Sequence, residues 1–266
     1  MAELFSDEGI ARVWVKAARR LYEIKGHTAQ NFLLEVRSPT RIDEADVRVV
    51  EMVDQQLRAA ADGLTIATVA GTLFPNGLSR RYARPDFYAH FLAAIEKGRE
   101  LGTWGTYARR MIDRVHPKTG QHYNPLDIII EKLRNASQGR HIRAAYELGI
   151  AAPYDLVDGF ELPLYDPATD GRRPTNIPCL SHLSFKFNVS NGLDLTAMYR
   201  SHHYGQRALG NLLGLSQLLA FVSKEAGLDS GTLTCLSTQA HLDVSTFGGE
   251  KAAGLLIKAI EDEFKI

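Results

Sequence analysis

The sequence places one of its two cysteines in an unusual position. Cys179 follows Pro178 directly, and an arginine-serine pair, Arg200-Ser201, ends a strand-like run further along the chain. A cysteine thiolate is intrinsically nucleophilic, and nearby arginines favour its ionisation. Cys179 is therefore a candidate nucleophile for covalent catalysis. The alternative is that Cys179 is a small residue that only packs in the interior.

A cysteine-histidine pair, as used by some hydrolases, is a second chemical hypothesis, because His182 is close to Cys179 in the sequence. Residues three apart on a β-strand point to opposite faces of the sheet. A catalytic pair would therefore need a β-bulge between the two residues, and the sequence leaves this possibility open.

The remaining cysteine and a pair of histidines have simpler interpretations. Cys235 lies among Leu233, Thr234 and Leu236 in a strand-like run, which predicts a core residue. His202 and His203 are adjacent, and neighbouring side chains on an extended chain diverge. No cysteine or carboxylate joins them at the spacing of metal ligands, so we expect no metal site.

The composition limits the kind of partner. The chain has 266 residues, 45% of them hydrophobic, which is enough for one domain with a substantial core, expected to span residues 1–266. The formal net charge is zero, so no basic field would attract a nucleic-acid polymer, and a small nucleotide is the more reasonable partner. Two cysteines make no disulfide framework, and the sequence shows neither a signal peptide nor a membrane-spanning run. We expect a cytoplasmic protein that does not bind a membrane.

Apolar periodicity and turn residues predict alternating helices and strands. Helices are expected over residues 7–24 with Ser6 as N-cap, and over 43–64, 85–101, 124–136, 208–226 and 250–264. Strands are expected over 31–36, 140–148 and 231–244, while 65–71 is either a strand or a helical turn. The stretch 151–178 is rich in Pro, Asp and Gly and is interpreted as a loop.

Two alternating runs flank Asn191-Gly192 and give the clearest local pattern. "HLSFKFNVS" and "LDLTAMY" are typical of β-strands, and Asn-Gly favours the positive φ angles of a type I′ turn. A tight β-hairpin is therefore predicted. Together with the helices it indicates an α+β fold in which a large, mixed or antiparallel sheet is flanked by helices.

The order of these pieces resembles the thymidylate synthase family, and especially its shorter, archaeal-type members. The pieces are the proline-cysteine pair, the hairpin, "RS", "GN" at the start of a long helix and "AH" at the end of a strand. "GTWGTYARRM" and "GRHIRAAYEL" match more weakly. The resemblance implies a thymidylate-synthase-like domain that forms a homodimer.

The resemblance also implies the reaction and the residues that carry it. A thiolate, here from Cys179, adds to carbon 6 of a pyrimidine 5′-nucleotide and makes carbon 5 enolate-like, so that carbon 5 accepts a methyl or hydroxymethyl group. The implied substrate-binding residues are Arg200 and Ser201 for the phosphate, Asn211 for the base, His241 for a sugar hydroxyl, and Arg140, donated by the partner subunit, for the phosphate. An asparagine amide has a donor and an acceptor, which suit the N3–H and O4 edge of uracil.

Several positions depart from the family pattern. His203 stands where the family has the aspartate that holds the pterin of folate, and Asp243 stands where it has a tyrosine near the sugar. Trp104 replaces a tyrosine that assists proton removal from carbon 5, and Tyr107 is the candidate catalytic substitute. The implied cofactor is 5,10-methylenetetrahydrofolate, with His203 at its binding position. The alternative is a nucleotide-binding homologue in which catalysis is lost or altered.

Overall fold

The computed structural model of the chain describes residues 2–60, 64–97, 107–116, 119–138, 161–164 and 178–265. The helices are α1 (Ile10–Glu23), α2 (Glu44–Ala59), α3 (Ile66–Leu73), α4 (Asn76–Ser79), α5 (Asp86–Lys97), α6 (Tyr107–Ile112), α7 (Pro125–Ser137), α9 (Leu209–Ala226) and α10 (Glu250–Phe264). The strands are β1 (Glu3–Asp7), β2 (Thr28–Val36), β3 (Arg114–Val115), β4 (His122–Tyr123), β5 (Glu161–Pro163), β6 (Leu180–Phe187), β7 (Leu193–Tyr199), β8 (His202–His203) and β9 (Ser230–His241). A π-helical turn, Tyr204–Ala208, precedes α9, and a 3₁₀ turn, Val244–Phe247, precedes α10.

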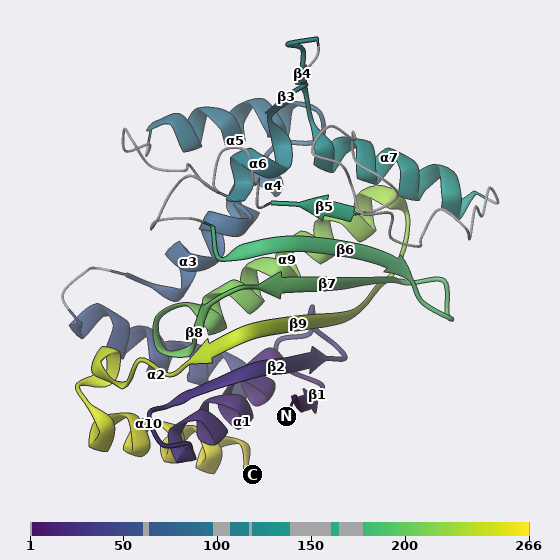
Figure 1. Cartoon of the computed structure of the whole chain (residues 1–266). Coiled ribbons are helices and arrows are strands. Elements are labelled where there is room, and N and C mark those ends of the chain that lie inside the picture. The colour runs from purple at the N-terminus through teal and green to yellow at the C-terminus, as the bar shows by residue number, and fades with distance from the viewer. Residues whose placement is uncertain are drawn as a thin grey trace.

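The main sheet contains both parallel and antiparallel pairs of strands. Its order is β1-β2-β9-β7-β6-β5, and β8 also pairs with β9. β1 is parallel to β2, and β9 is parallel to both β7 and β8. The other pairs are antiparallel. Because β7 and β9 are parallel neighbours, their C-terminal ends lie at the same edge of the sheet (Figure 1).

Helix α9 lies behind the sheet in Figure 1 and is buried on nearly every side. Two glycines allow α3 to pack closely against it. A Cβ at Gly210 would lie 2.6 Å from the Cβ of Val69, and a Cβ at Gly214 would lie 2.8 Å from the carbonyl oxygen of Ala70. A glycine inside a helix costs about 1 kcal/mol relative to alanine, so the close contact between the two helices offsets a real helical disadvantage.

The opposite face of the sheet carries no described helix in front of its central strands (Figure 1). A row of cross-strand neighbours runs over this face through Leu4, Leu33, Leu236, Met198 and His182. Leu4 is 58% exposed and Met198 is 37% exposed. These five residues, called the open-face row below, form an apolar band with one histidine at its end.

The predicted α+β fold, with a large mixed sheet flanked by helices, is confirmed by this architecture. The predicted helix over 250–264 is α10, and the predicted strand over 31–36 lies inside β2. The stretch 65–71, which the sequence left open, begins helix α3. The strand expected over 140–148 lies outside the described residues, and a single domain over 1–266 stays a prediction. No helix among the described residues combines the length and apolar character needed to cross a membrane.

Ser6 does not cap the first helix as the sequence predicted. It lies in β1, which pairs with β2, and its hydroxyl donates to Glu35 Oε1 at 2.8 Å. The helix α1 begins at Ile10, after Gly9. Ser6 and Asp7 are therefore part of the sheet, and the helix begins later than predicted.

The hairpin is confirmed, but its turn is not of type I′. The last strand pair is Phe187–Leu193, and the N–H of Asn188 donates to the carbonyl of Gly192. In this turn only Asn191 has a positive φ, at 62°, whereas a type I′ turn needs two such residues. The side chain of Asn188 accepts hydrogen bonds from the N–H groups of Ser190 and Gly192, which stabilises a longer loop.

The interpretation of residues 151–178 as a loop is wrong at one place. Glu161–Pro163 forms strand β5, which pairs antiparallel with β6 at the edge of the main sheet. Leu162 is fully buried. Strand β5 has only three residues, which are too few to show a periodic pattern. The Pro, Asp and Gly residues around it therefore led to the prediction of a loop.

Candidate functional site

The candidate site lies at the sheet edge where β7 and β9 end and β6 begins (Figure 1). Cys179 immediately precedes β6, Arg200 follows β7, and His241 ends β9. Tyr199 pairs with Leu180 on one side and with Ser237 on the other. The strand pairing thus brings predicted site residues from distant parts of the chain to one edge.

Cys179 is held by backbone contacts on both sides. Its N–H donates to the phenolic oxygen of Tyr107 at 3.2 Å, and the N–H of Leu180 donates to the same oxygen at 3.3 Å. The carbonyl oxygen of Cys179 accepts from the N–H of Arg200 at 2.8 Å. Burial raises the pKa of Tyr107 to about 12, so the phenol is neutral at physiological pH. Tyr107, predicted from the sequence as a catalytic substitute, lies against the backbone of the candidate nucleophile.

The charge state of Cys179 reflects two opposing effects. Desolvation in its half-buried position raises the pKa of the thiol above 9.0. The positive charges of Arg200 and Arg207 act in the opposite direction and lower it. Burial has the larger effect, so the arginines do not by themselves ionise the free thiol as the sequence suggested. A reaction through the thiolate would need the thiol to lose its proton as the substrate is engaged.

Arg200 is tied to the same segment as Cys179. Its Nε and a terminal nitrogen lie 3.3 and 2.8 Å from the carbonyl oxygen of Pro178, to which they donate. The hydroxyl of Thr238 donates to the carbonyl oxygen of Arg200 at 2.9 Å. Ser201 follows directly and is half-buried. An arginine in this position places a fixed positive charge beside the candidate nucleophile.

Asn211 belongs to a buried polar cluster behind the sheet edge. It lies in the first turn of α9 and is 6% exposed. Its amide lies 3.1 Å from His202 Nε2, and His202 Nδ1 lies 2.9 Å from the hydroxyl oxygen of Ser237. The imidazole of His202 stacks on the ring of Tyr199 with centroids 4.1 Å apart. Burial lowers the pKa of His202 to about 3, so this ring is neutral.

His241 and His203 form the outer part of the site. His241 Nδ1 lies 2.9 Å from the hydroxyl of Thr28, and the two imidazole rings meet edge to face with centroids 5.6 Å apart. Asp243 is turned inward, where its carboxylate accepts from the N–H of Gly205 and the hydroxyl of Thr246. Asp243 therefore holds the π-helical turn in place, which accounts for an acid at this position.

A β-bulge lies between Cys179 and His182. Strand pairing passes from Leu180–Tyr199 to His182–Met198, so Ser181 is an extra residue. This is the irregularity that a cysteine-histidine pair would require. The objection based on strand alternation therefore no longer applies.

No protein-family model matches the chain. It is 30% identical to a "Putative thymidylate synthase" of Methanococcoides burtonii over 169 residues, which cover 63% of this chain and 65% of the relative. It is 36% identical over 159 residues to a protein of the same name from Methanosarcina acetivorans, covering 60% and 61% of the two chains. A third protein of that name, from Methanosarcina barkeri, is 30% identical over 137 residues, or 52% of each chain.

The chain is therefore similar in sequence to proteins named putative thymidylate synthases. The resemblance seen in the sequence is confirmed by these relatives, and the fold is consistent with it. The matched stretches span less than two thirds of each relative's length.

The candidate site has predicted parts that lie outside the described residues. Arg140, expected from the partner subunit, and Trp104 both fall there, as does Gly139 beside Arg140. The roles of Arg140, Tyr107, Ser201 and the other predicted site residues stay predictions.

Two residues of the candidate site were not predicted from the sequence. Arg207 lies on the π-helical turn, and its charge lowers the pKa of both Cys179 and Tyr107. The sequence suggested only a metal-binding role for His202, and no metal site was expected. Among the residues that the structure describes, no three His, Cys, Asp or Glu side chains gather to hold a metal ion. Neither residue has a sequence signal, because a π-helical turn and a buried histidine depend on tertiary contacts.

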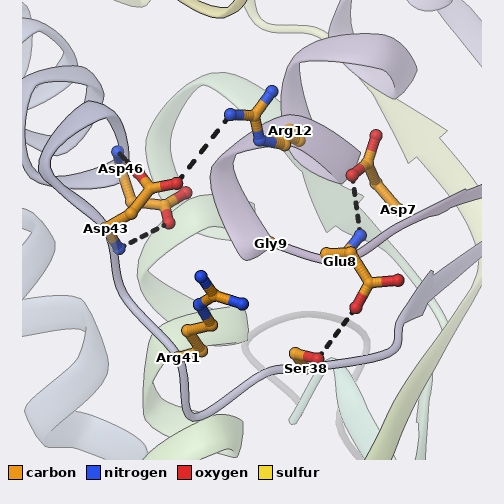
Figure 2. Close-up of a pocket in the computed structure, with 8 residues that line it drawn as sticks. All are labelled: Asp7, Glu8, Gly9, Arg12, Ser38, Arg41, Asp43 and Asp46. Atoms are coloured by element: carbon orange, nitrogen blue, oxygen red, sulfur yellow. Dashed lines mark hydrogen bonds and ion pairs between the residues drawn. The ribbon is translucent and has the colours of Figure 1, made fainter.

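A separate hollow of about 310 Å³ lies beyond the opposite end of β2 from His241. Figure 2 shows the residues that line it, which are Asp7, Glu8, Gly9, Arg12, Ser38, Arg41, Asp43 and Asp46. Asp43 and Asp46 form the capping box of α2, and Arg12 lies 3.8 Å from Asp43. The hollow shares no lining residue with the candidate site. Its acids are already engaged, because Asp43 and Asp46 cap α2 while Asp7 and Glu8 form ion pairs with Lys16 and Arg37.

Proposed function

We propose that this chain transfers a one-carbon unit to carbon 5 of a pyrimidine 5′-nucleotide through a covalent adduct with Cys179. The product is a methylated or a hydroxymethylated nucleotide, and a uracil base is favoured by Asn211. The proposal rests on the resemblance and on one structural observation. Arg200 is held beside the half-buried Cys179 at the edge of the sheet, since its N–H donates to the carbonyl oxygen of Cys179 and its guanidinium donates to that of Pro178. The charges of Arg200 and Arg207 lower the pKa of the thiol.

The proposed steps use this chain's own residues. The Cys179 thiol loses its proton to solvent water, and the thiolate sulfur adds to carbon 6 of the ring. The electron pair of the C5–C6 double bond moves toward carbon 5 and O4, which makes carbon 5 nucleophilic. The arginines would favour the thiolate and the nucleotide phosphate, since both are anions. After substitution, loss of the proton on carbon 5 and expulsion of the thiolate restore the aromatic base.

The one-carbon donor proposed from the resemblance is 5,10-methylenetetrahydrofolate, which supplies the carbon in its electrophilic form. The described residues around His203 do not offer the expected carboxylate to a pterin. The imidazole of His203 offers at most one acceptor, and both oxygens of the nearby Asp243 already accept hydrogen bonds. The donor set therefore does not fit the pterin at this position. The steps proposed here therefore run through Cys179 and the nucleotide, and none is assigned to the donor.

The proposed assembly is a cytoplasmic homodimer. The open-face row supports it, because apolar side chains on a sheet face that no described helix covers are suited to packing against a second copy. Subunits paired through this face would each bury Met198 and Leu236.

Release of tritium from a [5-³H]pyrimidine nucleotide tests the proposed function. Uracil and cytosine nucleotides are each assayed with and without methylenetetrahydrofolate. The wild-type protein should release tritium, and Cys179→Ser should release none while its nucleotide affinity changes only a few-fold. Cys235→Ala is the matched control, because Cys235 is fully buried in the core. Undiminished release by Cys179→Ser would rule out the cysteine adduct.

A nucleotide-binding homologue with altered catalysis is the second candidate. The raised pKa of Cys179 and the missing carboxylate at His203 favour it. Nucleotide binding without tritium release under any donor condition would support this candidate instead.

A further inference from the structure

Four buried polar side chains form a continuous chain behind the candidate site. Tyr204 Oη lies 3.2 Å from Ser237 Oγ, which lies 2.9 Å from His202 Nδ1. His202 Nε2 then lies 3.1 Å from the amide of Asn211. Tyr204, Ser237 and His202 are at most 1% exposed, so bulk water is not available to satisfy their hydrogens.

The direction of the hydrogen bonds follows from counting donors. Among the described residues, the only hydrogen-bond contact of the Tyr204 hydroxyl is with Ser237, so its hydrogen must point to Ser237 Oγ. The hydrogen of Ser237 must then point to His202 Nδ1, which is an acceptor only if the ring proton is on Nε2. The reverse direction would leave the Tyr204 hydrogen buried without an acceptor, which is unfavourable.

This count decides which way the Asn211 amide faces. A donor at His202 Nε2 needs an acceptor, and the amide supplies one only through Oδ1. The amide oxygen and nitrogen have nearly the same shape and are told apart by their partners. A half-turn of the amide exchanges Nδ2 for Oδ1 opposite His202 and gives the hydrogens of Tyr204, Ser237 and His202 an acceptor each.

We infer that His202 fixes the orientation of the Asn211 amide, with Oδ1 toward the imidazole, and thereby decides which pyrimidine edge Asn211 reads. This inference rests on the proposed function for its substrate class. The neutral state of the buried His202 ring agrees with it, since a protonated ring would carry donors on both nitrogens.

The consequence concerns the choice between uracil and cytosine. Uracil presents N3–H and O4, whereas cytosine presents N3 and the amino group at carbon 4. A freely rotating asparagine amide serves either base by turning over, so it discriminates poorly by itself. His202 holds Oδ1 of the amide against its Nε2–H. A base that needs the amide turned over would place the Nδ2 donor of Asn211 against the Nε2–H donor of His202. One unmet buried donor corresponds to roughly ten- to a hundredfold in affinity.

The tautomer of His202 can be measured without any nucleotide. A two-bond ¹H–¹⁵N correlation spectrum of the protein with ¹⁵N-labelled histidine distinguishes the Nε2–H form from the Nδ1–H form. The His202 signals are assigned by their loss in His202→Phe, which keeps a ring to stack on Tyr199. The Nε2–H form is expected. An Nδ1–H form would overturn the inference whatever the protein binds.

Calorimetry with deoxyuridine and deoxycytidine 5′-phosphates tests the specificity. The measured quantity is the affinity for the nucleotide that wild type prefers, divided by the affinity for the other. This ratio should fall at least tenfold in His202→Phe. It should also fall in Ser237→Ala, where the hydrogen bond that selects the tautomer is lost. Tyr204→Phe is the matched control, because the Ser237 hydrogen still has only His202 Nδ1 as acceptor, so the ratio should persist. An unchanged ratio in His202→Phe would overturn the inference. A protein that binds neither nucleotide would overturn the proposed function and this base reading, while the tautomer would still test the amide orientation.

Discussion

The phenolic oxygen of Tyr107 accepts the N–H of Cys179 at 3.2 Å, which joins helix α6 to the residue that precedes β6. The same oxygen accepts the N–H of Leu180. One hydroxyl thus satisfies two neighbouring backbone donors beside the candidate nucleophile. The position of the Cys179 thiol depends on this contact across the fold.

Replacing Tyr107 by phenylalanine should therefore lower both the stability and the activity of the protein. Two N–H groups lose their acceptor, which costs about 1–3 kcal/mol if they stay unpaired. Displacement of the thiol should reduce tritium release by roughly ten- to a hundredfold, since small misplacements of reacting groups are costly. Urea unfolding and the release assay are compared with those of Tyr123→Phe, a half-buried tyrosine on β4. Full activity in Tyr107→Phe would show that this contact does not position the nucleophile.

Alkylation of Cys179 should become steadily faster as the pH rises. Because burial raises the pKa of the thiol above 9.0, only a small fraction is thiolate near neutrality, and that fraction grows with pH. Arg207→Ala removes a charge that lowers the pKa, so alkylation at a fixed mildly alkaline pH should slow, whereas Arg207→Lys should retain much of the rate. Iodoacetamide labelling followed by peptide mass analysis measures it, and buried Cys235 is the internal control. A rate that is flat from neutral to alkaline pH would contradict the raised pKa.

Acid should destabilise the protein partly through His202. Its pKa is near 6.5 when exposed and about 3 in the folded protein. Between these values the unfolded state binds a proton that the folded state does not, so stability falls as the pH decreases, by about 1.4 kcal/mol per pH unit. Above the unfolded value His202 has no effect. Urea unfolding across this range should show a shallower fall for His202→Phe than for wild type, and equal slopes would contradict the buried neutral ring.

The open-face row should control the oligomeric state. Placing a charge at Met198, as in Met198→Lys, would bury that charge between two sheets and should shift a dimer toward monomer. Sedimentation velocity measures the shift. Val189→Lys is the matched control, because Val189 is fully exposed at the hairpin tip. A wild-type protein that sediments as a monomer would contradict the proposed dimer.

The sequence predicted the parts of the fold that have strong local patterns. The alternation around Asn191-Gly192 predicted the hairpin, and apolar periodicity predicted α7 and α10, because a buried stripe or face leaves a regular spacing. The prediction of a type I′ turn was wrong because the side chain of Asn188 stabilises a longer loop. Strand β5 was missed because three residues carry no period.

The candidate site was only partly predictable for a similar reason. Cys179, Arg200 and His241 were found from their order along the chain, and the strand pairing brings them to one edge. The role of His202 could not be predicted, because it depends on contacts with Ser237 and Asn211 that form only in the folded protein. The pKa of the Cys179 thiol also depends on burial, which the sequence around Cys179 does not predict.

The central claim is that Cys179 forms a bond to carbon 6 of a pyrimidine nucleotide. The direct measurement is peptide mass mapping after incubation with methylenetetrahydrofolate and a 5-fluoropyrimidine nucleotide, whose fluorine cannot leave as the proton does. Ribose and deoxyribose forms are both used, with Cys179→Ser as the control. We predict a nucleotide-bearing peptide that contains Cys179 and is absent from the variant. An unmodified Cys179 in a protein that nevertheless releases tritium from the natural substrate would contradict the claim.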